Sequence, residues 1–401
     1  MTTHSPTATT IGDAENPGGL RHTPALDGIR GIAIILVLID HLFGSNNSTG
    51  SALFNLLAAI RQSTWVGVNI FFVLSGFLIT GILWDTLHKP NFFRNFYARR
   101  TLRIFPLYYT FLLALMALTR VFHLQWNGAQ PYLLTYTLNL AYWHRAPMDL
   151  AFFNVNHFWS LQVEEQFYLV WPLVVFRIRN IRALIFTAAA VATIPLIIRF
   201  FSVLAPQHLP QLFLFSPTFQ RADDLLYGCI LALLMRTNAR RWIAAHAAKI
   251  LAAVAVILLA LAIHARGFTV YSGVLIPTIG ISILDVGTCA LIALALAPRS
   301  LATRFLDNWS LRQFGRYSYG LYVYHYSISG LLSPPLRAFF NAHFHSKAIA
   351  VLATGLIVAA VSVAIAVASY HLYEVHFLRF KRFFSYTSNR ISHPSPQTPS
   401  S

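Results

Sequence analysis

Residues 26–43 read LDGIRGIAIILVLIDHLF and combine a long apolar run with an arginine and a histidine. Arg30 and His41 stand eleven positions apart, so at about 100° per residue they share one helix face, about 16 Å apart along the axis. Asp27 joins this face one turn earlier. Ionisable side chains in a membrane helix are costly unless they face the protein interior or a wet cavity, so this face is a candidate functional site. The alternative is that Arg30 reaches the membrane interface and His41 is a hydrogen-bonded residue at a helix end.

The composition excludes a soluble domain. The 401 residues are 56% hydrophobic, 14% aromatic and only 11% charged, whereas soluble domains carry about 25% charged residues. The formal net charge of +17 does not indicate nucleic-acid binding, because the basic residues form short clusters between apolar runs, as in membrane proteins. Cys229 and Cys289 both lie in apolar segments, so we expect no disulfide framework and no cysteine-based metal site.

The chain divides into one membrane domain and two tails. Residues 1–22 are rich in Thr, Gly and Pro and predict a disordered N-terminal tail rather than a secretory signal. Residues 385–401 predict a disordered C-terminal tail. Between them, residues 23–384 predict a single all-α domain, a polytopic bundle of transmembrane helices.

The apolar segments predict about ten transmembrane helices, and residues 130–145 predict a re-entrant or interfacial piece. With the N-terminus inside, most Lys and Arg residues fall on the cytoplasmic side, and a minority, Arg199 among them, fall outside. This bias predicts that both termini are cytoplasmic. The predicted spans are 24–44, 65–85, 104–122, 158–176, 183–204, 219–236, 247–265, 273–297, 316–333 and 347–370.

A basic loop, NFYARRTLRIFPLYY, follows the second span. Arg99 and Arg103 share one face, and the forked donors of arginine suit phosphate oxygens. Arg100 lies between them, at the predicted cytoplasmic mouth of the third span. The loop therefore favours an anion site, although membrane topology alone also explains its charge. In the second span, Asn69 is the polar exception.

The fourth span contains the most informative polar cluster, NHFWSLQVEEQFYLVWP. Ser160, Glu164 and Tyr168 follow each other at intervals of four residues and form one stripe. Glu165 lies about 100° away from Glu164. Two adjacent glutamates in an apolar helix indicate a functional site, with a salt bridge between helices as the alternative.

Two further spans carry polar groups. In FQRADDLLYGCILA, Arg221 and Asp224 are three residues apart and can neutralise each other, which leaves Asp223 for another partner. In FGRYSYGLYVYHYSIS, His325 shares a face with Tyr322. This face either lines a wet cavity or contains a hydrogen-bonded core histidine.

Together these motifs are similar to the acyltransferase-3 family, bacterial integral-membrane O-acyltransferases that modify carbohydrates. The resemblance rests on the order and spacing of six stretches: LDGIRGIAIILVLIDH, VGVNIFFVLSGFLI, RRTLRIFPLYY, FWSLQVEEQFYLVWP, GRYSYGLYVYH and SYHLYE. It implies a multi-pass protein of the bacterial cytoplasmic membrane. It also implies that an acyl group, expected to be acetyl, passes from acyl-coenzyme A to a hydroxyl of a carbohydrate or glycoconjugate.

The resemblance assigns roles to residues at matching positions. His41 is expected to be the catalytic base, and Glu164 and Glu165 match the double glutamate of the family. The expected acyl-coenzyme A-binding residues are Arg30, Arg99, Arg100 and Arg103. The polar patterns described above, rather than the resemblance, give the expected supporting residues Asp27, Asn69, Ser160, Arg221, Asp223 and His325. No metal and no permanently bound cofactor is expected. The large members have a C-terminal hydrolase-like domain, whereas here only a short tail is expected.

In the predicted mechanism, His41 takes the proton of the acceptor hydroxyl while a carboxylate orients the imidazole. The candidate carboxylates are Glu164 or Glu165, and otherwise Asp40 or Asp223. The candidate oxyanion donors are Asn69, Ser160 and Tyr168.

Two other functions fit the composition less well. A proton-coupled transporter or flippase for a lipid-linked glycan would use the buried Glu, Asp and His residues as a relay, and it would not cleave a thioester. A heptahelical sensor would need fewer spans and fewer polar clusters. The sequence does not indicate the oligomeric state.

Overall fold

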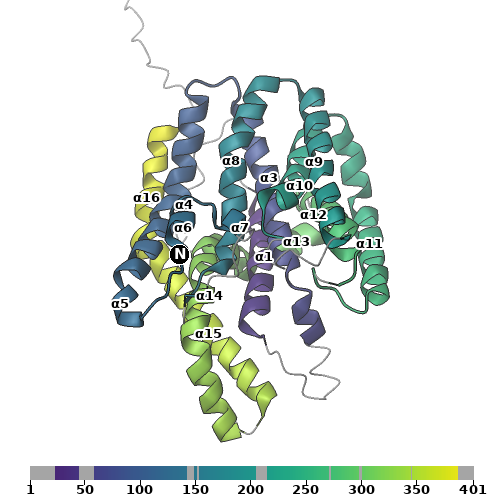
Figure 1. The fold of residues 1–401 in the computed structure, drawn as a ribbon. Helices are drawn as coiled ribbons and strands as arrows, with labels where there is room; N and C mark the ends of the chain where they lie inside the picture. Colours follow the sequence, from purple (N-terminus) through teal and green to yellow (C-terminus); the bar gives the residue numbers. More distant parts are fainter. Residues whose placement is uncertain are drawn as a thin grey trace, which may run out of the picture.

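The protein folds into an all-helical bundle (Figure 1). The structure, a computed structural model, describes residues 23–44, 58–141, 149–150, 153–204, 215–270, 272–297, 300–344 and 346–386. Both predicted tails lie outside these residues, except that Ser385 and Tyr386 are described.

The helices are α1 (Pro24–Leu42), α3 (Val66–Thr86), α4 (Phe92–Ala117), α5 (Thr119–Phe122), α6 (Gln130–Leu134), α7 (Leu138–Ala141), α8 (Trp159–Ile178), α9 (Ile181–Leu204), α10 (Thr218–Leu234), α11 (Ala239–His264), α12 (Ile281–Ala295), α13 (Leu301–Leu306), α14 (Trp309–Phe344), α15 (Lys347–Ser369) and α16 (Val375–Arg379). Short 3₁₀ or π segments are η1 (Asn156–Phe158), η3 (Ile276–Gly280), η4 (Tyr370–Glu374) and η5 (Phe380–Phe384). The strands β1 (Asp149–Leu150) and β2 (Phe153–Asn154) form one antiparallel pair.

Helix α1 lies inside the bundle, between α3 and α14. Helices α9 to α12 form one side of the molecule, and α4 and α16 form the other (Figure 1). The lower part of α14 and α15 extends beyond the remaining helices. The largest apolar core is shared by α3, α4, α8 and α10 and contains the fully buried Phe72, Tyr108 and Phe158.

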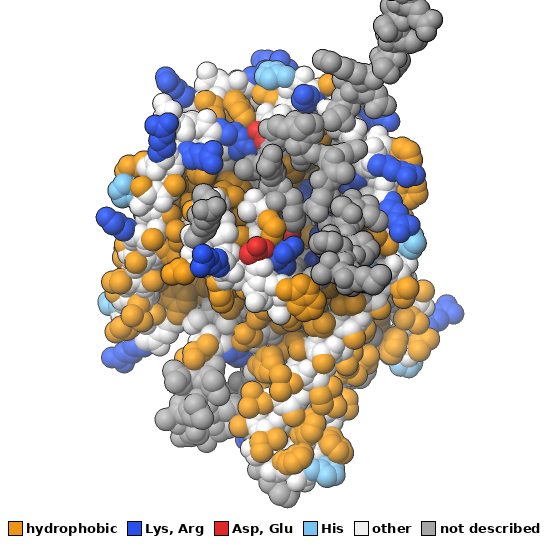
Figure 2. Space-filling model, turned by 180° about the vertical axis from the view of Figure 1, so that it is seen from behind, with side chains coloured by type: hydrophobic (Ala, Val, Ile, Leu, Met, Phe, Trp, Pro, Cys, Tyr) orange, Lys and Arg blue, Asp and Glu red, His pale blue; other side chains and the backbone are white. Residues whose placement is uncertain are grey.

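The protein has helices suited to a membrane. Within the described residues, five helical stretches are long and apolar enough to cross one: Ala58–Thr86, Ile181–Leu204, Ala239–His264, Ile276–Ala295 and Lys347–Phe384. Basic side chains gather at the upper end of the molecule, whereas the flanks are largely hydrophobic (Figure 2). Such a distribution is typical of a positively charged cytoplasmic end. The number of ten spans and the cytoplasmic position of the termini stay predictions.

One local expectation requires correction, and a second stays a prediction. The predicted basic loop before residue 104 is helical, because α4 begins at Phe92 and continues through the arginines to Ala117. The residue before it, Asn91, has a left-handed backbone (φ 56°) and turns the chain into the helix. The expected re-entrant piece, residues 130–145, contains the short helices α6 and α7 up to Ala141, and its remaining residues lie outside the described part.

Helices α3 and α10 touch at the level of their backbones. A Cβ atom on Gly76 would lie 1.9 Å from the carbonyl oxygen of Leu225, and one on Gly228 would lie 1.9 Å from that of Val73. Small residues permit such close approach between membrane helices. The contact sets the register in which the polar residues of α3 and α10 meet.

Helix α1 meets α14 in the same way. A Cβ on Gly31 would lie 2.0 Å from the carbonyl oxygen of Leu311, and one on Gly315 would lie 1.9 Å from that of Asp27. The two helices that carry His41 and His325 are therefore held at a fixed spacing.

We predict that Gly228→Ala destabilises the protein by about 1–3 kcal/mol or more, since the added methyl group overlaps a backbone carbonyl that cannot move aside. Thermal unfolding in detergent, followed by tryptophan fluorescence, measures the effect. Gly44→Ala is the matched control, because its Cβ would come no closer than 3.6 Å to a neighbour, the Arg61 side chain. Equal melting temperatures for the two variants would contradict the backbone contact.

Candidate active site

A cavity between α1, α3, α4, α8 and α14 brings together polar groups from distant parts of the sequence. It contains about 790 Å³ of space between atoms, its open mouth included. Its walls are Arg30, Val68, Phe71, Phe72, Leu74, Ser75, Arg100, Arg103, Ile104, Ser160, Leu161, Glu164, Tyr168, Ser318, Tyr319 and Tyr322. We call this space the arginine cavity.

Three guanidinium groups face the arginine cavity. Arg30 comes from α1, and its side chain, 32% exposed, lies 3.4 Å from Asp27 one turn earlier. Arg100 and Arg103 come from α4. The guanidinium of Arg100 lies 4.4 Å from the ring centre of Tyr168, and its Nε atom is buried without a hydrogen-bond partner among the described residues. These donors have capacity for an anionic ligand.

Arg99 does not line the cavity with the other arginines. Its Nη1 atom donates to the carbonyl oxygens of Lys381 (3.2 Å) and Phe384 (3.3 Å). Its guanidinium also lies 5.9 Å from the ring centre of Tyr386. Burial raises the pKa of Tyr386 to about 12, so this hydroxyl stays neutral beside the arginine. Arg99 therefore anchors the C-terminal segment to α4.

Helix α8 presents one stripe of its residues to the cavity. Ser160, Glu164 and Tyr168 all line it, as their spacing predicts. The hydroxyls of Tyr168 and Ser75 are hydrogen-bonded to each other. Glu165 is not among the lining residues, and its Oε1 atom is buried without a partner in the described part of the chain. The two adjacent glutamates thus have different surroundings.

His41 belongs to a cluster of three histidines next to the cavity. Its Nδ1 atom lies 2.8 Å from Nε2 of His325, on α14. The ring of His41 also stacks on that of Tyr326, with 4.4 Å between centres. His157, from η1, lies edge-on to His325 at 5.1 Å. We call His41, His157 and His325 the histidine cluster.

Tyr322 lies between the arginine cavity and the histidine cluster. Its ring lines the cavity, and its hydroxyl lies 2.6 Å from that of Ser160 and donates to the carbonyl oxygen of His157. Its own carbonyl oxygen accepts hydrogen bonds from His157 Nε2 (2.9 Å) and His325 Nδ1 (3.0 Å). Tyr322 thus lines the same cavity as Arg30 and is bonded to His325, the partner of His41.

The structure corrects the expected carboxylate partner of His41. The group that contacts the imidazole is His325, whereas Glu164 faces the arginine cavity. The other candidates have different partners: Asp40 lies 3.5 Å from Arg61, and Asp223 is paired with Arg199. Helix periodicity indicates which face a residue occupies, but it does not identify the neighbour on another helix.

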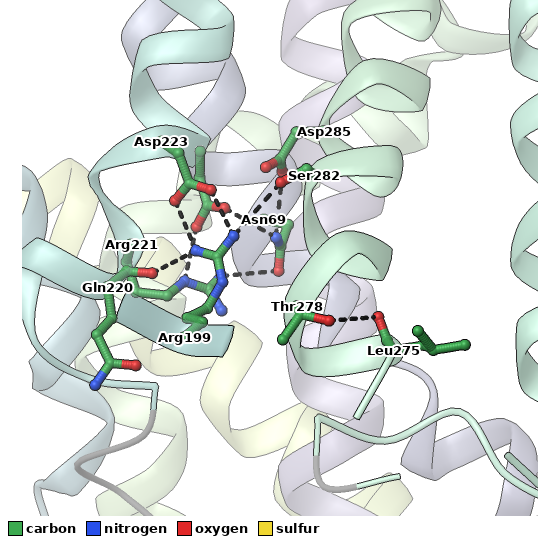
Figure 3. Close-up of polar contacts among 10 residues, drawn as sticks. Asn69, Arg199, Gln220, Arg221, Asp223, Leu275, Thr278, Ser282 and Asp285 are labelled. Carbon is green, nitrogen blue, oxygen red and sulfur yellow. Dashed lines mark hydrogen bonds and ion pairs between the residues drawn. The ribbon is translucent and has the colours of Figure 1, made fainter. Parts of the chain in front are cut away.

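Asn69, Arg221 and Asp223 lie in a separate buried network, not at the arginine cavity (Figure 3). The predicted pair of Arg221 and Asp224 is confirmed, with Nε 2.7 Å from Oδ2. Asn69 bridges this network: its Oδ1 accepts from Arg221 (2.9 Å), and its Nδ2 donates to Asp285 (3.2 Å). Asn69 therefore belongs to this network, and its side chain does not serve as an oxyanion donor at His41.

Arg199 and Asp223 form the second ion pair of this network. Both arginine Nη atoms reach the carboxylate, at 2.8 and 2.6 Å, and the two side chains are 1% and 0% exposed. Arg199 lies in α9, within the predicted span 183–204, and the side of the membrane that it faces stays a prediction. A lone arginine in an apolar helix indicates a buried partner.

The network contains three carboxylates and two guanidinium groups. Oxygen atoms of Asp223, Asp224 and Asp285 lie within 4.8 Å of one another. Asp223 and Asp224 are each paired with an arginine, while Asp285 Oδ2 has no partner among the described residues. Because two of the three carboxylates already bind guanidinium groups, the arrangement is a structural ion-pair network. Sequence reasoning passed over Asp285, although a lone carboxylate within ISILDVGTCALIALA indicates a buried partner.

Comparisons with known proteins identify the family of the chain. The family model of the acyltransferase domain, in the acyltransferase-3 family, matches residues 23–371. The chain therefore belongs to the acyltransferase-3 family. The matched region is an acyltransferase domain, and the apolar helices indicate a membrane protein. No solved structure shows a significant match.

Three relatives illustrate the similarity. O-acetyltransferase OatA of Staphylococcus aureus is 27% identical over 349 residues, which cover 81% of this chain and 52% of that protein. Putative peptidoglycan O-acetyltransferase YrhL of Bacillus subtilis is 28% identical over 376 residues, 88% of this chain and 54% of the relative. Peptidoglycan O-acetyltransferase OatA of Listeria monocytogenes is 27% identical over 339 residues, 79% and 51%. The chain spans about half the length of these relatives.

We predict that Asp223→Asn lowers the free energy of unfolding by about 3–5 kcal/mol, because the Arg199 guanidinium would remain buried without its counter-charge. Thermal unfolding in detergent measures the loss. Asp307→Asn is the matched control, since its pair with Arg312 (3.3 Å) is 48% and 41% exposed and such pairs contribute about 0–1 kcal/mol. A similar effect of both substitutions would show that the buried pair has no special role.

Proposed function

We propose that the protein transfers an acyl group, in the first place acetyl, from acyl-coenzyme A to a hydroxyl of a carbohydrate or glycoconjugate at the bacterial cytoplasmic membrane. The observation that carries this proposal is the position of the arginine cavity beside the histidine cluster. The cavity offers cations to a phosphorylated donor, and the cluster offers a base to an alcohol. Tyr322 contacts both: its ring lines the cavity, and its carbonyl oxygen accepts hydrogen bonds from His157 and His325.

The charges of the arginine cavity favour a phosphorylated ligand. Arg30, Arg100 and Arg103 face it, and Glu164 is the one carboxylate among its lining residues. Guanidinium groups bind phosphate oxygens through paired hydrogen bonds, which become strong where water is scarce. The nucleotide end of coenzyme A therefore binds here, and the pantetheine arm extends along α1 toward His41.

The transfer itself needs a base and no metal ion. His41 removes the proton from the acceptor hydroxyl while the oxygen attacks the thioester carbonyl carbon. The tetrahedral intermediate then collapses, the carbon–sulfur bond breaks, and the thiolate takes the proton back from His41. The products are an O-acyl ester and free coenzyme A.

The names of the relatives support one acceptor class. Two of them are named for peptidoglycan O-acetylation, so cell-wall glycan is the first acceptor class to test for this chain. A free hydroxyl of the glycan is the group that would be acylated. Other surface polysaccharides present the same chemistry.

We predict that Arg103→Gln raises the KM for acetyl-coenzyme A at least about tenfold while kcat changes little, because it removes a charge that binds the donor equally in the ground and transition states. Thiol release by purified protein with muropeptide or oligosaccharide acceptors provides both constants. Arg182→Gln, at an exposed position on α9, should leave both constants unchanged. An unaltered KM in the Arg103 variant would remove this residue from the donor site.

We predict that His41→Ala lowers kcat by about 10²- to 10⁴-fold, the usual contribution of a general base. The thiol-release assay measures this change, and mass spectrometry of the acceptor confirms that acyl transfer is lost. Wild-type turnover in the His41 variant would exclude the proposed mechanism. Transport of a lipid-linked glycan without thioester cleavage would instead favour a flippase.

A further inference from the structure

We propose that His325 is a positioning residue that holds His41 in the tautomer whose Nε2 atom is free to accept the substrate proton. This inference rests on the proposed function, in which His41 is the base. It replaces the expected carboxylate with a neutral imidazole. A chain of hydrogen bonds leads from the α14 backbone through His325 to His41.

The backbone of α14 determines the tautomer of His325. Its Nδ1 atom lies 2.9 Å from the carbonyl oxygen of Leu321 and 3.0 Å from that of Tyr322. Carbonyl oxygens only accept hydrogen bonds, so Nδ1 carries a hydrogen atom. The side chain is 0% exposed, and no carboxylate contacts it within the described residues. A positive charge would be uncompensated there, so the ring is neutral and Nε2 carries a lone pair.

This lone pair determines the tautomer of His41. His325 Nε2 lies 2.8 Å from His41 Nδ1. Because His325 Nε2 is an acceptor, His41 Nδ1 must be the donor and carry the hydrogen atom. The remaining nitrogen of a neutral His41, Nε2, then has a free lone pair. Which ring nitrogen of a histidine is basic is set by the bond that the other one makes.

Stacking holds the His41 ring in this orientation. The rings of His325 and Tyr326 lie 5.1 and 4.4 Å from it, at interplanar angles of 18° and 27°. Rotation of the His41 ring would break both the stacking and the hydrogen bond. The hydrogen bond to His325 therefore fixes the direction of the His41 ring, and it also fixes which ring nitrogen carries the hydrogen atom.

A neutral partner differs from a carboxylate in one respect. An aspartate beside a catalytic histidine fixes its tautomer and also stabilises the imidazolium that forms. His325 provides the first of these effects but carries no negative charge. Its loss should therefore reduce kcat without affecting the distant donor site.

The test uses two amides of different length. In His325→Gln, the side-chain oxygen reaches the former position of Nε2 and accepts from His41. In His325→Asn, the amide can still donate to the α14 carbonyls, but it is one methylene too short to reach His41. We expect kcat for thiol release to fall about 10- to 100-fold in the asparagine variant, within the range of a misaligned base. The glutamine variant should retain most of the rate, and both should keep the wild-type KM for acetyl-coenzyme A.

His343→Gln is the matched control, because His343 is an exposed histidine of the same helix and its replacement should change neither constant. A wild-type kcat in His325→Asn would overturn the proposal. Equal losses in both amide variants, together with equally lowered melting temperatures, would also overturn it in favour of a packing role.

A second measurement is independent of turnover. The protein has 16 histidines, and ¹⁵N labelling of histidine with a His41→Ala difference spectrum identifies the signals of His41. We expect a hydrogen atom on Nδ1 in the wild type and on Nε2 in His325→Asn. A hydrogen on Nε2 in the wild type would refute the inference. Absence of thiol release by the wild type, or full activity of His41→Ala, would instead refute the proposed function.

Discussion

A charge buried between apolar helices has to be matched by another group of the protein, and this constraint separates the two polar regions of the bundle. In the network of Figure 3, Arg199 and Arg221 each bind one aspartate, and Asn69 joins the pairs across α3. Every guanidinium there has its counter-charge. In the arginine cavity, three guanidinium groups face one lining carboxylate. The first region holds helices together, whereas the second retains capacity for a ligand.

Close contacts between helices determine where these charged groups lie relative to one another. Gly76 and Gly228 bring the backbones of α3 and α10 together, so that Asn69 and Asp224 meet. In the same way, Gly31 and Gly315 allow α14 to pack directly against the backbone of α1. Neither pair of helices can rotate without a backbone clash. The 2.8 Å contact between His41 and His325 depends on this fixed approach.

The sequence predicted the features that depend on one helix. Periodicity placed Ser160, Glu164 and Tyr168 on one stripe, and the three side chains do line one cavity. A spacing of three residues paired Arg221 with Asp224, and the ion pair is present. In both cases the relevant geometry is local, because 3.6 residues per turn determine it.

Features that depend on two helices were not predictable. The partner of His41 is a histidine 284 residues further along the chain, and no pattern within α1 identifies it. Arg199 lies within a predicted span, but nothing in that span identifies its partner, Asp223, which lies on the next helix. Arg99 shares a face with Arg103 in α4, yet the C-terminal segment occupies its donors. Pairing across helices depends on packing, which composition and periodicity do not specify.

Tyr322 is linked to both polar groups in two different ways. Its hydroxyl makes two hydrogen bonds, to Ser160 and to the His157 carbonyl, while its own carbonyl belongs to the α14 backbone. A rotamer change would break the two hydroxyl bonds, at about 1 kcal/mol each, and would move the ring away from those of His157 and His325, whose centres lie 5.1 and 5.8 Å from it. The carbonyl would stay in place, because the helix holds it, and would still accept hydrogen bonds from both histidines. The hydrogen bonds to the two imidazoles therefore depend on the peptide group of this tyrosine and not on its phenol.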